Sequence, residues 1–168
     1  MKRNLLWFFG LAIMAATTFT FTACDDDPCK DVKCGDNGDC FDGACVCDQG
    51  FEGTNCDVTW ANKFVATWNA IDVCVDQAGV SITTPYPAVV SQVSASKINV
   101  KNFGGFDIAA SVDFDLSAAD AITIAGTDNG GRVFAGTGVL GTDGKITYTY
   151  KVTYSDGTFE NCTGTMSK

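Results

Sequence analysis

The stretch from Cys29 to Cys56 reads CKDVKCGDNGDCFDGACVCDQGFEGTNC, and it decides how the first part of the chain folds. Its six cysteines are separated by four, five, four, one and eight residues. The few apolar side chains between them cannot close a hydrophobic core, and modules this short are usually held together by covalent bonds. An even cysteine count in an exported chain favours a disulfide framework, although the spacing alone leaves the pairing open.

The segment that precedes this stretch is typical of an export signal over residues 1–23. Lys2 and Arg3 form a basic start, and an apolar run follows from Leu5 to Ala16. That run is shorter than the roughly 20 residues that a membrane-spanning helix needs. The sequence FTAC, which ends at Cys24, resembles the bacterial lipobox, and this resemblance implies that Cys24 carries a lipid anchor. The alternative is ordinary signal cleavage that leaves Cys24 unmodified.

Residues 24–27 form an acidic tether, because Asp25, Asp26 and Asp27 directly follow Cys24. Acids in this place resemble the surface-export signal of lipoproteins from Bacteroidetes. The resemblance implies an outer-membrane lipoprotein that faces the cell exterior. Two alternatives stay open: the inner-membrane retention signal of enteric bacteria, and a plain solvated linker.

Residues 28–57 resemble a domain of the epidermal-growth-factor-like (EGF-like) family, in its tenascin-like form. The resemblance rests on CVC at 45–47, GFEG at 50–53, the final cysteine and the Asn-Gly pair at 37–38. It implies the pairs Cys29–Cys40, Cys34–Cys45 and Cys47–Cys56. A knottin-like or zinc-binding cluster is the alternative, but a Cys-x-x-Cys pair is missing and an exported chain meets an oxidising compartment.

Calcium is not expected in this module. Some EGF-like domains bind the ion through acids near the first and third cysteines, and Asp25, Asp27 and Asp42 stand at compatible positions. However, Pro28 replaces the acidic or amide residue that such domains carry, and the loop from Cys40 to Cys45 is too short for the expected aromatic residue. We therefore predict neither a metal nor another cofactor.

Residues 58–168 have the pattern of an antiparallel β domain. In the segment 145–154, isoleucine, valine and tyrosine alternate with lysine and threonine, as in a strand with one buried face. Eight or nine short strands separated by glycine-rich turns predict a β-barrel, with a β-sandwich as the alternative. Strands are expected near 63–75, 88–94, 97–103, 106–116, 121–126, 131–139, 145–154 and 158–167, with a short one at 79–83 and a helical turn at 59–62. The sequence Ala66-Thr67-Trp68 resembles the first strand of calycin and lipocalin barrels, in which a tryptophan plugs one end.

Cys74 and Cys162 are expected to form a fourth disulfide. One closes the first expected strand and the other lies in the last, so a bond between them would hold these strands side by side, as a closed barrel requires. A three-residue turn over 155–157 places Cys162 opposite Tyr150 on the apolar face, whereas a two-residue turn places it opposite Lys151 on the wet face. We predict the three-residue turn.

The same register aims several polar and aromatic side chains into the barrel. They are candidates for lining a ligand cavity, with the alternative that the rings fill a solid core. Two acids are expected near one mouth of the barrel. The candidates are Trp68, Tyr148, Tyr150 and Tyr154, with Asp72 and Glu160 as the acids.

The amino-acid composition excludes some classes of function. The chain of 168 residues has no histidine, which excludes Ser-His-Asp and Cys-His nucleophilic sites, and its net charge of −9 argues against nucleic acid. Asp72 and Glu160 could serve as an acid–base pair only if they met in a cleft, which their spacing does not indicate. We therefore predict a non-enzymatic lipoprotein that binds an unknown protein or glycan partner, with a small-ligand-binding barrel as the alternative.

Overall fold

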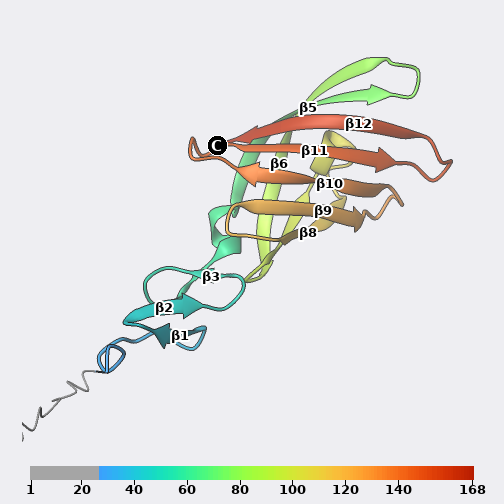
Figure 1. Cartoon of the computed structure of the whole chain (residues 1–168). Coiled ribbons are helices and arrows are strands. Elements are labelled where there is room, and N and C mark those ends of the chain that lie inside the picture. The colour runs from blue at the N-terminus through green and yellow to red at the C-terminus, as the bar shows by residue number, and fades with distance from the viewer. Residues whose placement is uncertain (1–26) are drawn as a thin grey trace, which may run out of the picture.

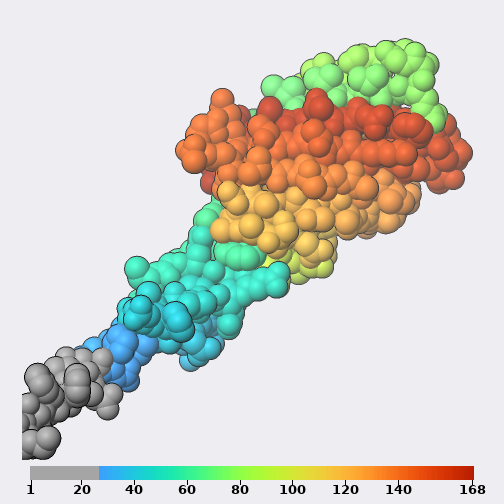
Figure 2. Space-filling view, in the orientation of Figure 1, coloured from blue at the N-terminus to red at the C-terminus, as the bar shows by residue number. Residues whose placement is uncertain are grey.

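The computed structural model describes residues 27–168, and it divides them between a small disulfide module and a β-barrel (Figure 1). The expected signal segment, Cys24, Asp25 and Asp26 lie outside the described residues. In the space-filling view, the module extends from one end of the barrel (Figure 2). Among the described residues, no helix has the length and apolar character to cross a bilayer.

The module contains two short antiparallel ribbons. Strands β1 (Gly38–Phe41) and β2 (Ala44–Cys47) form the first, and β3 (Phe51–Glu52) and β4 (Val58–Thr59) form the second. The three disulfides are those implied by the EGF-like resemblance: Cys29–Cys40, Cys34–Cys45 and Cys47–Cys56.

The barrel is closed and consists of eight antiparallel strands in the order β10-β11-β12-β5-β6-β7-β8-β9. This confirms the mainly-β prediction and selects the barrel over the sandwich. The strands are β5 (Ala66–Asp76), β6 (Ser81–Ser94), β7 (Lys97–Lys101), β8 (Ser111–Leu116), β9 (Ala121–Thr127), β10 (Val133–Leu140), β11 (Ile146–Thr153) and β12 (Phe159–Ser167).

The first and last strands of the barrel are neighbours. In β11 and β12, Tyr150 lies opposite Cys162, which is the register that a three-residue turn over 155–157 predicts. Across the next ladder Cys162 lies opposite Cys74 of β5, and the two cysteines form a disulfide. The disulfide therefore joins the barrel where its two chain ends meet.

Strand β6 departs from the prediction of two separate strands at 79–83 and 88–94. It runs unbroken through Pro85 and Pro87, which pair with β5 on one side. Its ladder with β7 starts only at Val89, so neither proline has a β7 partner to which its missing N–H would have donated.

The strand expected over 106–116 begins only at Ser111. Before it, the chain forms the short 3₁₀ helix η2 (Phe103–Gly105). Asn102, Gly104 and Gly105 all have positive φ there, and the backbone reverses against the inside of the barrel. The side chain of Asn102 anchors this reversal by donating a hydrogen bond to the Pro87 carbonyl at 2.8 Å.

The 3₁₀ helix η1 (Trp60–Lys63) connects the module to the barrel, one residue later than the helical turn expected at 59–62. The Trp60 indole donates to the Phe51 carbonyl at 3.1 Å, and the Trp60 amide donates to the Gly50 carbonyl at 2.8 Å. On the barrel side, the Ala61 amide donates to the carbonyl of Ala95, in the turn between β6 and β7. The two modules are thus in direct contact as well as covalently continuous.

Candidate functional site

A buried carboxylate lies at the centre of the barrel and is held by three phenols. Asp72 of β5 is 0% exposed. Tyr150 and Tyr86 donate to its Oδ2 at 2.6 and 3.0 Å, and Tyr148 donates to its Oδ1. The hydroxyls of Tyr86 and Tyr148 are 3.1 Å apart. We call these four residues the Asp72 cluster.

Strand alternation and one glycine place the Asp72 cluster. Tyr148 and Tyr150 are two residues apart in β11, so both rings face inward, as does Tyr86 of β6. Gly164 of β12 lies opposite both Tyr148 and Asp72. A Cβ atom at Gly164 would stand 2.3 Å from the Asp72 carboxylate and 2.4 Å from the Tyr148 ring. Only glycine leaves room for this cluster.

Burial shifts the acid–base equilibria of the cluster. It raises the pKa of Asp72 above the usual value of an aspartate, although the hydrogen bonds from the three phenols partly oppose this. Burial also raises the pKa of Tyr148, Tyr150 and Tyr86, and the negative charge of Asp72 raises each further. The phenols therefore stay protonated and act as donors. As the pH rises, the carboxyl group of Asp72 loses its proton before any phenol of the cluster does.

The position of Asp72 corrects the sequence prediction, which placed it with Glu160 near one mouth of the barrel. Alternation gave the correct face of β5, but the side chain lies in the closed interior because Tyr86 and Tyr148 cover it. Glu160 is half-buried in β12, where it accepts a hydrogen bond from Tyr154 at 3.0 Å. Burial raises the pKa of Tyr154 to about 12, and the hydrogen bond to Glu160 is the second cause of this shift.

The barrel interior is filled around the candidate ligand-lining residues. Trp68 is fully buried, and its indole donates to the Phe64 carbonyl at 2.7 Å. An apolar cavity bordered by Tyr148, Phe103 and Met166 has a volume of only about 10 Å³. A space of this size holds at most one water molecule. Trp68, Tyr148 and Tyr150 therefore act as core residues in this structure.

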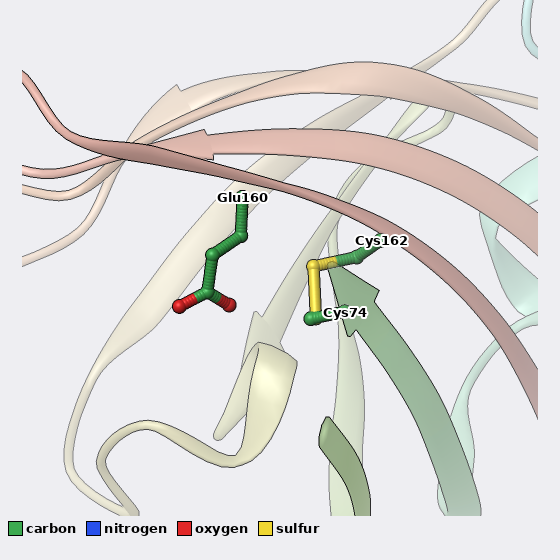
Figure 3. Close-up of side chains that lie close together, drawn as sticks. All are labelled: Cys74, Glu160 and Cys162. Carbon is green, nitrogen blue, oxygen red and sulfur yellow. A yellow bond between two sulfur atoms is a disulfide. The ribbon is translucent and has the colours of Figure 1, made fainter. Parts of the chain in front are cut away.

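Glu160 also lies beside the barrel disulfide (Figure 3). Its carboxylate and the sulfurs of Cys74 and Cys162 lie within 4.8 Å of one another, all directed to the same side of the strands. Metal ions bind to thiolates, and both sulfurs are bonded to each other here. The oxidised cluster offers a single carboxylate, which is too few ligands for a metal centre.

A small apolar patch lies on the outside of the disulfide module. Phe41 is 73% exposed at the end of β1, and Val46 of β2 is 58% exposed on the same face of the ribbon. We call Phe41 and Val46 the ribbon patch. Phe51, the other aromatic residue of the module, is half-buried beside η1, and its carbonyl accepts the Trp60 indole N–H.

Comparison with protein families identifies the first module. Residues 29–59 match the Teneurin-like EGF domain family. The described chain therefore combines a teneurin-like EGF domain with a closed eight-stranded antiparallel β-barrel. A comparison with curated protein sequences gives no match.

The structural comparison gives distant likenesses. A redesigned β-barrel is 17% identical with a TM-score of 0.49, over 67% of this chain and 96% of the other. A redesigned barrel called mFAP1, bound to DFHBI, is 17% identical with a TM-score of 0.47, over 64% and 97%. A protein of unknown function from Bacteroides ovatus is 16% identical with a TM-score of 0.46, over 60% of this chain and 40% of the other.

Proposed function

We propose that the protein is a non-enzymatic interaction protein, carried on the outer membrane by a lipid on Cys24 and facing the cell exterior. In this proposal the EGF-like domain supplies a contact surface, and the barrel is the folded body that carries it. The observation that supports this most directly is the ribbon patch, in which Phe41 is 73% exposed.

The ribbon patch supports binding because it contributes little to the fold. The buried positions of residues 28–57 are Cys34, Gly50 and Cys56, so the module is stabilised by its disulfides rather than by Phe41 or Val46. Aromatic side chains that are free of the core are enriched among the residues that dominate protein interfaces. Phe41 is therefore available to insert into a partner.

The geometry of the barrel favours a binding role over catalysis. Asp72 is closed off from solvent and already accepts hydrogen bonds from three phenols, so a substrate outside the barrel has no path to its carboxylate. A cavity of about 10 Å³ gives equally little support to the alternative of a ligand held inside the barrel.

The anchoring part of the proposal is tested on intact cells. We expect mass spectrometry to find a lipid on Cys24 and added protease to digest the folded domains without lysis. Cys24→Ser should release the protein from the membrane fraction. Protection of the chain from protease in intact cells would contradict the outward orientation.

The contact surface is tested with residues 27–168 coupled to beads. Adhesion is measured to immobilised fibronectin, collagen and mucin, and to a layer of cells that express the same protein. We expect Phe41→Ser to lower adhesion by roughly tenfold or more, as truncation of a central aromatic contact does. The matched control is Ile108→Ser, which removes a side chain that is 80% exposed on the barrel. Equal adhesion of the Phe41 variant and the wild type would refute the role of the ribbon patch.

A further inference from the structure

A shallow, open depression on the outer wall of the barrel is unrelated to the ribbon patch and to the interior. Figure 2 turns the wall formed by β9 to β12 toward the viewer. One depression of about 480 Å³ reaches from β10 across β11 and β12 to β5, and another of about 420 Å³ lies next to it over β10, β11 and β12. Thr149 and Thr163 border both depressions, so the two form one continuous feature, which we call the outer trough.

Three glycines border the outer trough. Gly136 lies in the floor of the first depression, and Gly138 and Gly164 lie in the floor of the second. A Cβ atom at Gly136 would stand 2.1 Å from the Thr149 carbonyl oxygen, and one at Gly138 would stand 3.0 Å from the Tyr148 side chain. Gly136 and Gly138 lie opposite the buried Tyr150 and Tyr148, so their missing side chains leave room inside the barrel, and on the outer face these glycines contribute only backbone to the trough.

The rim of the outer trough is rich in hydroxyl groups and poor in charge. Its outward-facing side chains include Thr137, Thr147, Thr149 and Thr163, with methyl groups from Val73 and Val75. Among the described residues that border the trough, Lys151 carries the single charge, and its Nζ lies 3.8 Å from the centre of the Phe159 ring.

This lack of charge is local. The chain has 20 acidic residues, and the far wall of the same barrel carries charges on its outward positions. There Lys97 of β7 pairs with Asp115 of β8 at 3.2 Å, and Asp113 accepts a hydrogen bond from Asn99. The strands of the outer trough thus differ from β7 and β8 in chemistry although both walls are equally regular β-structure.

We propose that the outer trough binds a neutral glycan chain. Threonine hydroxyls both donate and accept hydrogen bonds, which matches the hydroxyls of a sugar, and the valine methyl groups offer apolar contact to its C–H faces. A charged polymer would find one ammonium group and no carboxylate. An apolar segment would leave the threonine hydroxyls without partners.

The test uses residues 27–168 and neutral hexasaccharides of glucose, mannose, xylose and N-acetylglucosamine, with a heparin hexasaccharide and hexagalacturonate as charged controls. Calorimetry or a glycan array measures binding. Thr149→Arg and Thr163→Arg place a bulky cation in the trough at exposed positions. Thr67→Arg is the matched control, because Thr67 faces outward from β5 but lies outside both depressions. Circular dichroism checks that each variant is folded.

We expect at least one neutral hexasaccharide to bind, with affinity lowered roughly tenfold or more by each trough variant and within about twofold of wild type for the Thr67 variant. Three results would overturn the proposal: no neutral glycan bound at millimolar concentration, equal binding of the charged glycans, or unchanged affinity in the trough variants. A dimer that sedimentation detects in the wild type and that Thr149→Arg abolishes would assign the trough to a second copy instead. These results are independent of Cys24 and Phe41, on which the proposed function rests.

Discussion

The two modules of this protein stay folded by different physical means. In the EGF-like domain the disulfides themselves occupy the interior, with Cys34 and Cys56 buried. In the barrel, a continuous cluster of apolar and aromatic side chains such as Trp68, Phe103 and Phe134 fills the interior, and a single disulfide is added to it. The importance of a disulfide therefore depends on which other interactions stabilise the same segment.

The lengths of the closed loops add to this contrast between the modules. The barrel disulfide spans 88 residues, whereas those of the EGF-like domain span 11, 11 and 9. Loop closure alone gives roughly 4–5 kcal/mol for the long loop and roughly 2.5–3 kcal/mol for each short one. The bond with the larger entropic effect is therefore the one that its module needs less, because the barrel also has a core.

The largest loss of stability is expected when Cys34→Ala is combined with Cys45→Ala. This change removes one short disulfide together with a buried sulfur of the EGF-like domain, which has no apolar core to compensate. We expect the domain to unfold completely while the barrel keeps its structure. Proton NMR measures this, because the resonances of residues 28–57 should collapse to random-coil positions while the dispersed barrel resonances remain.

The control for this experiment is the barrel spectrum of the same variant. A loss of barrel dispersion would mean that the contacts at Trp60 and Ala61 contribute substantially to the stability of the barrel. A domain that keeps its dispersion without the bond would contradict the view that disulfides replace the core.

The second-largest loss of stability is expected when Cys74 and Cys162 are both replaced by alanine. The barrel should lose up to about 4–5 kcal/mol of unfolding free energy, and it should still fold because the core remains. Urea unfolding followed by tryptophan fluorescence measures the loss, and the near-ultraviolet signal of the buried Trp68 should survive in the absence of urea. A random-coil spectrum in buffer would show that the core alone does not suffice.

The sequence predicts the EGF-like domain more completely than the barrel, because the signals for the two modules differ in range along the chain. Cysteine spacing is a local signal, so the EGF-like pairing follows from a resemblance over fewer than 30 residues. The barrel depends on contacts between distant strands, and alternation predicted which residues face inward, including Cys162 and Tyr150. Alternation does not encode depth along the barrel axis, which is why Asp72 was expected at a mouth.

The length of strand β6 could not be predicted because it depends on which strands lie beside it, and a single sequence does not show this. Pro85 and Pro87 are normally signals that a strand ends, yet β6 continues through them because β7 does not pair there. The outer trough is not evident from the sequence because it combines outward-facing residues of β5, β10, β11 and β12, and a single sequence does not show which strands lie side by side.

A smaller, pH-dependent effect on stability is expected from Asp72, whose carboxyl group lies inside the barrel's core. Its pKa is raised in the folded state, so the folded barrel holds the proton more tightly than the unfolded chain does. Stability from this group is therefore fully present below the unfolded pKa and is lost as the pH rises through the folded pKa. Asp72→Asn should remove this dependence without changing the shape of the side chain.

The measurement is the unfolding free energy of both proteins between pH 4 and 8, with the difference taken at each pH. Because other carboxyl groups titrate equally in the two proteins, the difference isolates Asp72. We expect the wild type to gain stability relative to the variant as the pH falls, by at most about 1.4 kcal/mol per pH unit. A difference that is independent of pH, or that grows with rising pH, would contradict a raised pKa.

The smallest effect is expected where the two modules meet, at the ion pair between Lys63 of η1 and Glu52 of β3. The Lys63 Nζ and Glu52 Oε2 are 2.7 Å apart, and both side chains are about one-third exposed. A double-mutant cycle with Lys63→Met and Glu52→Gln should give a coupling energy of roughly 0.2–1 kcal/mol, because solvent screens such pairs. The energy should fall further in 1 M salt. A larger value that salt leaves unchanged would mean that the pair is shielded from water, and that the junction contributes to the stability of both modules.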